Sequence, residues 1–430
     1  MLLLQYLFFL SLLFSGIVLA VPIQQEEQGG TSFIVDRIRR RDHKPHCPTA
    51  LRRAYRKFGI RSTNFGLSVL DFKRSRTSQL RQAVNGTQGA VEATSVSNGL
   101  EYVSSITIGG QTLRMNFDTG SADLWAFNTQ LPGTSTDGHS VYDPTKSKTS
   151  SPLPGLSWEI QYHDGTSASG NVVTDTVTTG GIGVANQAVE LPTSISDQLV
   201  ADHNVDGIVG VGFSNINKVK PQQQKTFFEN VAPSLKQPVM TAFLNSTGVG
   251  SYEFGVIDSN KYTGDLISVP VDSSNGYWQF KSPSFSVGGK PLQAIKTTTS
   301  SVADTGTSLL LVSPDVAKAF YSEVPGAIKS DGGYVYPCNT SLPTLALGVG
   351  DQYSVVLEPE ALTYAVDSVA QDGTLICSGG VQSCENGQFQ VFGDVFLKSV
   401  FTVFDLGGPS LQFGHLAVTP TPPAFVNSNS

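Results

Sequence analysis

The feature that most constrains the fold is an Asp-Thr-Gly sequence that occurs twice, in FDTGSADLW (117–125) and in VADTGTSLLL (302–311). The two aspartates, Asp118 and Asp304, are 186 residues apart. Each is followed by a segment with two apolar residues and a glycine: Gly210 lies 92 residues after Asp118, and Gly393 lies 89 residues after Asp304. The period is longer than that of any solenoid, so the pattern predicts two duplicated lobes.

The composition favours short strands and tight turns over long helices. The chain of 430 residues contains 43 glycines and 23 prolines. Apolar and polar residues alternate on either side of Gly-Gly turns in 100–120 and 170–191, and this pattern predicts antiparallel hairpins. Short helices are expected within 48–60, 223–235 and 313–324. We therefore predict an all-β, mainly antiparallel protein with few short helices.

The first 20 residues have the character of a signal peptide. Residues 2–20 carry no charge and end in Ala20 after an apolar run, although the basic residues that usually begin such a signal are missing. The run is long enough that a retained membrane anchor is an alternative. Because small and polar residues interrupt it, we expect cleavage near Ala20 and a secreted, extracellular protein without stable membrane association. The vacuole is the alternative destination, since both routes begin with the same signal.

Charge is divided unevenly between a basic head and an acidic body. Residues 36–82 carry 14 Lys and Arg against 3 Asp and Glu, whereas residues 83–430 carry 14 against 30. A basic run can bind nucleic acid or an anionic membrane, but in an exported chain we favour a propeptide, residues 21–90, that lies on its own acidic body. Protonation of carboxylates at low pH would weaken that attraction. Lys73-Arg74 is a dibasic site at which a processing protease could remove the propeptide instead.

Each Asp-Thr-Gly sequence follows an apolar strand, so each aspartate is expected at the buried end of a strand. One such aspartate is usually a turn or cap residue, but two in register suggest an interface at which Asp118 and Asp304 meet. Two carboxylates a few ångströms apart cannot both ionise easily and share one proton at mildly acidic pH. The ionised carboxylate can then take a proton from water while its partner donates one to a carbonyl oxygen. This chemistry needs no metal and no other cofactor.

The residues that follow each aspartate suit such a site. Thr119 and Thr305 can form a hydroxyl network between the two turns. Gly120 and Gly306 allow backbone amides to approach the carboxylates. The two turns are therefore expected to form one site together.

Five segments resemble, in order and spacing, the pepsin family of aspartic endopeptidases, and in particular its fungal secreted branch, typified by penicillopepsin and aspergillopepsin. They are FDTGSADLW (117–125), SWEIQYHDGTSASG (157–170), ADTGTSLLL (303–311), YVYPCNTSLP (334–343) and VFGDVFLKS (391–399). The likeness runs from 101 to 418, and the head resembles the family's propeptide. It implies a bilobal pepsin-like fold with an active-site cleft between an N-terminal lobe (91–270) and a C-terminal lobe (271–430), and it makes Asp118 and Asp304 the catalytic residues.

The resemblance also implies roles for residues around the two aspartates. Ser121 and Thr307 would be hydroxyl partners of their outer oxygens. A hairpin would form a flap over the cleft, and Trp125 would bond the hydroxyl of its Tyr162. Lys57 falls where family propeptides set a lysine against the catalytic pair. The flap and substrate-binding residues implied in this way are Trp125, Tyr162, His163, Asp164, Gly165 and Thr166.

Two flap residues depart from the family pattern. His163 stands where the family usually has glycine, and Thr166 replaces the usual serine two residues past Asp164. Histidine adds bulk and, below a pKa of about 6.5, a positive charge. Our hypothesis is that His163 alters the pH optimum or the side-chain preference; the alternative is a side chain turned to solvent.

The four cysteines leave more than one pairing open. Of Cys338, Cys377 and Cys384, two should form a disulfide in an oxidising compartment, and the sequence alone does not say which. The resemblance implies a bond between Cys338 and Cys377 and leaves Cys384 and Cys47 unpaired. A bond between Cys47 and Cys384, which would tether the propeptide, is the alternative. Candidate glycosylation sequons begin at Asn85, Asn245 and Asn339.

The expected function is that of an acid endopeptidase made as a zymogen and autoactivated at acidic pH. Its partners would be protein and peptide substrates, its own propeptide and pepstatin-type inhibitors, but not nucleic acid, and the enzyme would be a monomer. Asp164 would admit basic residues beside large apolar ones at the scissile bond. One alternative is a binding protein on the same fold, but both Asp-Thr-Gly turns and Tyr162 are intact. A secreted carbohydrate hydrolase would not explain the repeat or the basic head.

Overall fold

The structure is a computed structural model that describes residues 30–39, 45–60, 102–161, 166–203, 205–244 and 249–417. Several predicted features lie outside these ranges: the signal peptide, Lys73-Arg74, Asn85, Asn245 and the flap residues Tyr162, His163, Asp164 and Gly165. Within the described residues, none of the helices has the length and apolar character that a membrane span requires.

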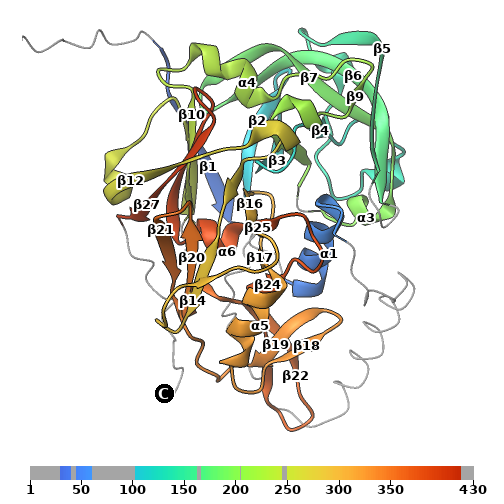
Figure 1. Ribbon diagram of the computed structural model, residues 1–430. Helices are drawn as coiled ribbons and strands as arrows, with labels where there is room; N and C mark the ends of the chain where they lie inside the picture. The colour runs from blue at the N-terminus through green and yellow to red at the C-terminus, as the bar shows by residue number, and fades with distance from the viewer. Residues whose placement is uncertain are drawn as a thin grey trace, which may run out of the picture.

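Strands dominate the described residues and build two lobes, which confirms the predicted all-β, bilobal fold (Figure 1). The cyan and green strands of the upper lobe belong to a 14-stranded sheet, and most of the orange strands below it form sheets of five, four and four strands. Strands from the C-terminal part of the chain also join the large sheet, so that one sheet runs through both lobes.

The large sheet contains, in spatial order, β12 (Tyr262–Pro270), β27 (Ser410–Leu416), β26 (Val400–Asp405), β10 (Val239–Leu244), β11 (Val249–Phe254), β1 (Phe33–Arg39), β2 (Tyr102–Ile108), β3 (Gln111–Asp118), β8 (Gly207–Gly210), β4 (Leu124–Ala126), β7 (Ile182–Ile195), β6 (Ser167–Thr179), β5 (Ser151–Gln161) and β9 (Val219–Lys220). The five-stranded sheet contains β13 (Gln279–Lys281), β16 (Ser300–Ala303), β25 (Gln390–Phe392), β17 (Leu310–Val312) and β24 (Val381–Ser383). The two four-stranded sheets are β15 (Gln293–Ala294), β14 (Ser284–Val287), β20 (Leu345–Val349) and β21 (Tyr353–Leu357), and β18 (Ile328–Ser330), β19 (Gly333–Pro337), β23 (Leu375–Gly379) and β22 (Thr363–Val369).

The two hairpins predicted from alternation around Gly-Gly turns are confirmed. β2 pairs antiparallel with β3, and β6 pairs antiparallel with β7. The turn residues Gly109 and Gly110 have φ values of +54° and +82°, and Gly180 and Gly181 have +56° and +84°. Two successive left-handed residues form the turn that matches the twist of a hairpin, and glycine adopts them without steric cost.

The predicted helices are present, one of them in shortened form. Among the described residues the α-helices are α1 (Cys47–Lys57), α3 (Asp197–Val200), α4 (Phe227–Val231), α5 (Pro314–Ser322) and α6 (Asp394–Leu397). The α1 and α5 helices confirm the expectations for 48–60 and 313–324. The α4 helix is shorter than the predicted 223–235, because the Thr226 hydroxyl and the Glu229 carboxylate form a capping box that starts it late, and a 3₁₀ turn that contains Pro233 follows it.

The sequence repeat corresponds to a structural repeat. In the N-terminal lobe, β8 pairs parallel with β3 and antiparallel with β4. In the C-terminal lobe, β25 pairs parallel with β16 and antiparallel with β17 in the same way. In each parallel pair, one strand leads to an Asp-Thr-Gly turn. The other strand carries the two apolar residues of the apolar-apolar-Gly segment. The predicted duplication is therefore confirmed at the level of strand pairing.

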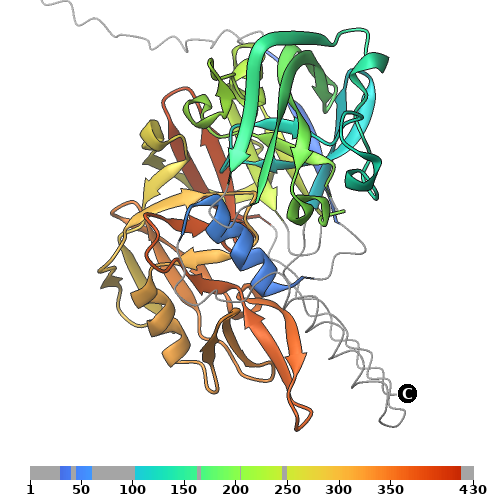
Figure 2. The same ribbon diagram turned by 90° about the vertical axis from the view of Figure 1, so that its right-hand side faces the viewer.

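The N-terminal segment, which we define as residues 30–39 and 45–60, is part of both the sheet and the lobe interface. Its strand β1 lies between β11 and β2 in the large sheet, with six residue pairs from Phe33↔Phe254 to Ile38↔Val249 on one side. Figures 1 and 2 both show its helix α1, in blue, between the green N-terminal lobe and the orange C-terminal lobe. This position places α1 over the two Asp-Thr-Gly turns.

Candidate active site

The two aspartates lie at equivalent ends of equivalent strands. Asp118 is the last residue of β3 and is 4% exposed; Asp304 follows β16 directly and is fully buried. The apolar residues before each aspartate pack into the core of their lobes, with Phe117 and Ala303 at most 1% exposed. The strand pairing that the repeat dictates thus brings the two predicted carboxyls to the lobe interface.

The two turns are cross-linked by their threonines. The Thr119 amide donates to Thr305 Oγ1 at 3.1 Å, and the Thr305 amide donates to Thr119 Oγ1 at 3.0 Å. Each hydroxyl in turn donates across the interface, Thr119 to the carbonyl of Ala303 at 2.9 Å and Thr305 to the carbonyl of Phe117 at 2.8 Å. The hydroxyl network expected from the sequence is therefore present, and it fixes the spacing of the two carboxyls.

Each outer carboxylate oxygen accepts a hydrogen bond from a nearby hydroxyl. Ser121 donates to Asp118 Oδ2 at 2.7 Å, and Thr307 donates to Asp304 Oδ2 at 2.5 Å. These are the two partners that the family resemblance implied. Because the hydroxyls hold the outer oxygens, both inner oxygens are left to face the space between the lobes.

The inner oxygens are held by backbone amides that only glycine allows so close. The Gly120 amide donates to Asp118 Oδ1 at 2.9 Å, and the Gly306 amide donates to Asp304 Oδ1 at 3.0 Å. A Cβ on Gly120 would lie 2.6 Å from Asp304 Oδ1 and from Lys57 Nζ. A side chain at this position would thus close the gap in which the two carboxyls meet.

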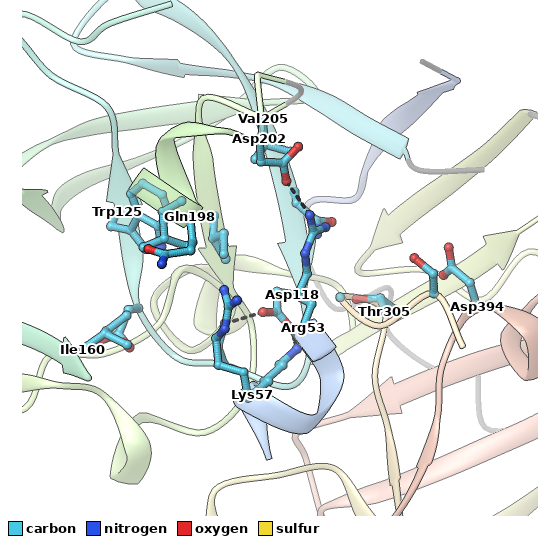
Figure 3. A pocket seen from close by; sticks show the side chains of 18 of the residues that line it. Arg53, Lys57, Asp118, Trp125, Ile160, Gln198, Asp202, Val205, Thr305 and Asp394 are labelled. Atoms are coloured by element: carbon cyan, nitrogen blue, oxygen red, sulfur yellow. Dashed lines mark hydrogen bonds and ion pairs between the residues drawn. The ribbon is translucent and has the colours of Figure 1, made fainter. Parts of the chain in front are cut away.

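Lys57 of α1 occupies that gap. Its Nζ bonds to Asp118 Oδ1 (Figure 3). The same atom lies 2.8 Å from both oxygens of Asp304. Burial acts to lower the pKa of Lys57, but the charges of the two carboxylates outweigh it and hold the pKa above its usual value. The lysine is therefore a cation that neutralises part of a buried anionic pair.

The two carboxyls differ in acidity in this state. Burial raises the pKa of Asp304 to about 6; Lys57 opposes this shift and Asp118 adds to it. Burial also acts to raise the pKa of Asp118, but the charge and hydrogen bond of Lys57, with bonds to Asp304 and Ser121, hold the pKa below its usual value. A pair of neighbouring carboxyls with separated acidities is the arrangement that general acid–base chemistry requires.

A second ion pair holds α1 to the N-terminal lobe. Arg53 donates to Asp202 at 2.9 Å, as Figure 3 shows above the Lys57 contact. Beside these contacts a cavity of about 130 Å³ remains, lined by residues that include Ser121, Trp125 and Ile160. The cleft is thus only partly filled by α1.

The predicted flap and substrate residues are only partly placed. Trp125 lies on β4, is 4% exposed and has its ring centroid 6.3 Å from that of Trp158. Thr166 is fully buried directly before β6. Since Tyr162 lies outside the described residues, its bond to Trp125 stays a prediction, as do the roles of His163, Asp164 and Gly165.

The cysteines follow the pairing that the resemblance implies. Cys338 and Cys377 form a disulfide, whereas Cys47 and Cys384 are buried free thiols, so no disulfide links α1 to the body in this structure. The sequon asparagine Asn339 is exposed next to the disulfide.

Some polar contacts of the N-terminal segment were not predicted. Arg37 of β1 is buried at 5% exposure, lies 3.7 Å from Asp394 and stacks over the ring of Tyr252 at 5.1 Å. Asp394 also lies 3.6 Å from Lys398. The charge division between head and body indicated attraction in general, but Arg37 and Asp394 are 357 residues apart in sequence, and no local pattern identifies them as partners.

Comparisons with known proteins agree with this geometry. A sequence model of the family described as eukaryotic aspartyl protease matches residues 101–416. The chain therefore belongs to the eukaryotic aspartyl protease family. It is 49% identical over 420 residues to an aspergillopepsin A-like aspartic endopeptidase of Aspergillus fumigatus, covering 95% of this chain and 98% of the relative.

Two further relatives come from other fungal species. Identity is 42% over 396 residues to aspartic protease PEP3 of Coccidioides posadasii, covering 89% of each chain. It is 44% over 337 residues to aspergillopepsin-1 of Aspergillus oryzae, covering 78% of this chain and 81% of the relative. These similarities confirm the resemblance to fungal aspergillopepsin-like endopeptidases.

Proposed function

We propose that this aspartic endopeptidase is a secreted acid enzyme made as a zymogen, with Asp118 and Asp304 as its catalytic residues. The observation that supports this most strongly is the symmetry of the carboxyl pair. Each carboxyl is held by one hydroxyl and one backbone amide, and both inner oxygens face the same Lys57 amine. Once that amine leaves, the inner oxygens can hold a water molecule beside a peptide carbonyl.

The proposed reaction is general acid–base hydrolysis without a covalent intermediate. Without Lys57, the two buried carboxyls share one proton between their inner oxygens, because both cannot ionise so close together. The ionised member takes a proton from the water as its oxygen attacks the carbonyl carbon, and the protonated member donates to the carbonyl oxygen. Collapse of the resulting tetrahedral intermediate transfers a proton to the leaving nitrogen. The hydrogen bonds of Thr119 and Thr305 keep both carboxyls in position through each step.

Residues 21–90 act as the propeptide in this proposal, and 91–270 and 271–430 are the two lobes. Lys57 blocks the site directly, and Arg53 holds α1 at the rim through Asp202. Acid protonates the carboxyl pair, which removes the attraction for Lys57 and leaves it as a buried cation without a counter-ion. Autoactivation at acidic pH follows from that loss.

Substrates are proteins and peptides, cleaved at large apolar residues and, through Asp164 on the flap, at basic residues too. Tyr162 and Trp125 would close the flap over the bound peptide, and pepstatin-type inhibitors would occupy the same cleft. The uncharged run before Ala20 supports secretion, with the vacuole as the alternative. The enzyme would act as a monomer, and the exposed Asn339 is a candidate for glycosylation along with Asn85 and Asn245.

The test is to express the precursor, shift it from neutral to acidic pH, and follow both its mass and its cleavage of haemoglobin. The controls are Asp118→Asn and pepstatin. The proposal predicts that the native precursor shortens and becomes active in acid, and that either control abolishes activity. A correctly folded, shortened protein that cuts nothing at any acidic pH would contradict it.

A further inference from the structure

A buried histidine contacts the loop that anchors the propeptide helix α1. His139 lies between β4 and β5, and its side chain is fully buried. Its Nδ1 is 2.9 Å from the carbonyl oxygen of Val205, and its Nε2 is 3.0 Å from the carbonyl oxygen of Val200. Both carbonyls belong to residues 197–203 and 205–206, which begin with α3 and which we call the α3 loop. The ring therefore bridges two points of one loop.

The geometry of these two contacts requires a doubly protonated ring. A neutral imidazole has one N–H donor and one acceptor nitrogen, whereas an imidazolium ion donates from both nitrogens. Because a carbonyl oxygen can only accept, a neutral ring would place a bare nitrogen against one of the two oxygens. The ring of Phe127 is stacked on that of His139, with centroids 3.6 Å apart and planes 13° apart, and an aromatic face also favours a cation. Both edges and one face of the His139 ring thus stabilise its charged form.

The charged groups around the ring act in opposite directions. Asp206 Oδ1 lies 4.0 Å from His139 Nδ1. Burial acts to raise the pKa of Asp206, but hydrogen bonds from Arg114 and from backbone amides hold the pKa below its usual value, so this group is a carboxylate. Arg114 opposes a second cation, but it forms an ion pair with Asp206 at 2.6 Å that largely cancels both charges. The His203 ring, with its centroid 5.5 Å away, is exposed to solvent that screens it. The direct contacts of the ring therefore decide its charge.

The α3 loop forms the side of the cleft to which α1 is anchored. Its residues Asp202 and Val205 line the cavity beside α1 (Figure 3). The Asp202 carboxylate accepts the hydrogen bond from Arg53 of α1 at 2.9 Å. Asp202 lies in the chain between Val200 and Val205, whose carbonyls His139 contacts. A shift of either carbonyl would move the carboxylate that anchors the propeptide.

We propose that His139 is a positioning residue, which as an imidazolium ion donates to both carbonyls and fixes the α3 loop in the precursor and in the mature enzyme. In the precursor this contact holds the Asp202 carboxylate against Arg53. In the mature enzyme it holds the same wall of the cleft in place for peptide substrates, and this part of the proposal rests on the proposed function. Imidazoles ordinarily gain their second proton below about pH 6.5, so the loop is fixed in acid and loosens as the pH rises.

The first test measures the protonation of His139 by NMR in the Asp118→Asn precursor, which cannot process itself, with nitrogen label only in histidine. The chain contains six histidines, and the spectrum of the His139→Gln variant identifies the His139 signals. At about pH 5 both ring nitrogens of His139 should carry a proton that exchanges slowly with solvent, because the side chain is buried. A ring with one bare nitrogen at this pH would overturn the proposal.

The second test follows amide hydrogen exchange by mass spectrometry in the same precursor in acid. His139→Gln should speed exchange in the α3 loop and, through Arg53, in α1 by about two- to fivefold, which is the most that a partly exposed ion pair contributes. In an Arg53→Ala background, His139→Gln should not change exchange in α1 any further, because the anchor is already lost. The matched control is His415→Gln, a change at an exposed imidazole on β27 that should affect neither segment. Faster exchange throughout the protein, or an equal effect on α1 with and without Arg53, would overturn the proposal.

The third test compares mature His139→Gln and native enzymes, each processed by an added protease. At about pH 4 the variant should show a KM for peptides raised about threefold or more, with kcat changed by less than about twofold. The smaller effect on kcat is expected because Thr119 and Thr305 hold the carboxyl pair independently of the α3 loop. The ratio of the two KM values should approach one towards about pH 6.5, where imidazoles ordinarily lose the second proton. The same ratio at every pH would refute this inference alone, whereas native enzyme that cleaves no peptide would refute the proposed function.

Discussion

Replacing Glu190 with Gln is expected to stabilise the folded protein at neutral pH and to leave its stability in acid unchanged. Glu190 and Asp123 are 1% and 4% exposed, and one amide nitrogen of Asn217 lies 3.1 Å from Glu190 Oε1 and 3.0 Å from Asp123 Oδ1. Burial raises the pKa of Asp123 to about 6. Burial, with Asp123 adding to it, holds the pKa of Glu190 well above its usual value. Asp123 lies five residues after Asp118 in the sequence.

The direction of the stability change follows from whether the folded or the unfolded state binds the carboxyl protons more tightly. A carboxyl with a raised pKa binds its proton more tightly in the folded state than in the unfolded state, so stability is greatest below the unfolded value, about 4, and falls as the pH rises towards the folded value. Each pH unit in this window costs about 1.4 kcal/mol per proton, so the two units up to the value for Asp123 cost about 3 kcal/mol. Glutamine does not titrate, so Glu190→Gln should remove the cost of ionising Glu190, whose pKa is also raised by burial, and restore stability on the order of 1–3 kcal/mol at neutral pH.

The assay is thermal unfolding at about pH 4 and about pH 7, in an Asp118→Asn background that prevents self-cleavage. A gain of about 2 kcal/mol corresponds to a rise of about 2–3 °C in the melting temperature of a chain of this size. The matched control is Glu159→Gln, a change at an exposed carboxyl of β5 that should shift neither melting temperature. An equal shift at both pH values would indicate a packing effect and refute the titration argument, as would no shift at neutral pH.

Three further changes give distinct outcomes. Lys57→Met removes the cation from the carboxyl pair, so the precursor should shorten at a pH about one unit higher than the native chain, and an unchanged pH of release in a mass assay would contradict the blocking role. Thr119→Val removes the donor to the Ala303 carbonyl and the acceptor of the Thr305 amide, which should lower the free energy of unfolding in urea by about 1–3 kcal/mol; a loss confined to kcat would argue against a structural role. His163→Gly should move the pH optimum of peptide cleavage, and identical pH profiles for the two enzymes would show that the side chain faces solvent.

The parts of the fold that local patterns determine could be predicted from the sequence. Alternation around Gly109-Gly110 and Gly180-Gly181 identified two hairpins, because the period of a strand and the left-handed turn are both local properties. The repeat predicted two duplicated lobes, since both halves obey one pattern, and the structure then showed equivalent pairings of β3 with β8 and of β16 with β25. The length of α4 was overestimated, because the spacing of apolar residues extends beyond the helix, whose start is set by the capping box of Thr226 and Glu229.

The contacts that depend on distant residues could not be predicted. The sheet brings Arg37 close to Asp394, and likewise Asp123 close to Glu190. No local sequence pattern around these residues predicts which residue each one contacts. Lys57 was placed only through the family resemblance, because a lysine at the end of a basic helix is otherwise a solvated side chain. The contacts between these residues therefore depend on the tertiary fold and not on local sequence.

The most direct test of the catalytic pair is the kcat/KM of mature enzyme that carries Asp304→Asn, with the propeptide removed by an added protease so that self-activation is not required. If the two carboxyls act together, kcat/KM should fall roughly 10³-fold relative to native enzyme treated in the same way. The variant cannot hold the shared proton that activation of water and protonation of the carbonyl oxygen both need. The Ser121→Ala enzyme, which removes a hydrogen bond and keeps both carboxyls, should lose much less. A folded Asp304→Asn enzyme that keeps more than about one tenth of the native kcat/KM would contradict the account.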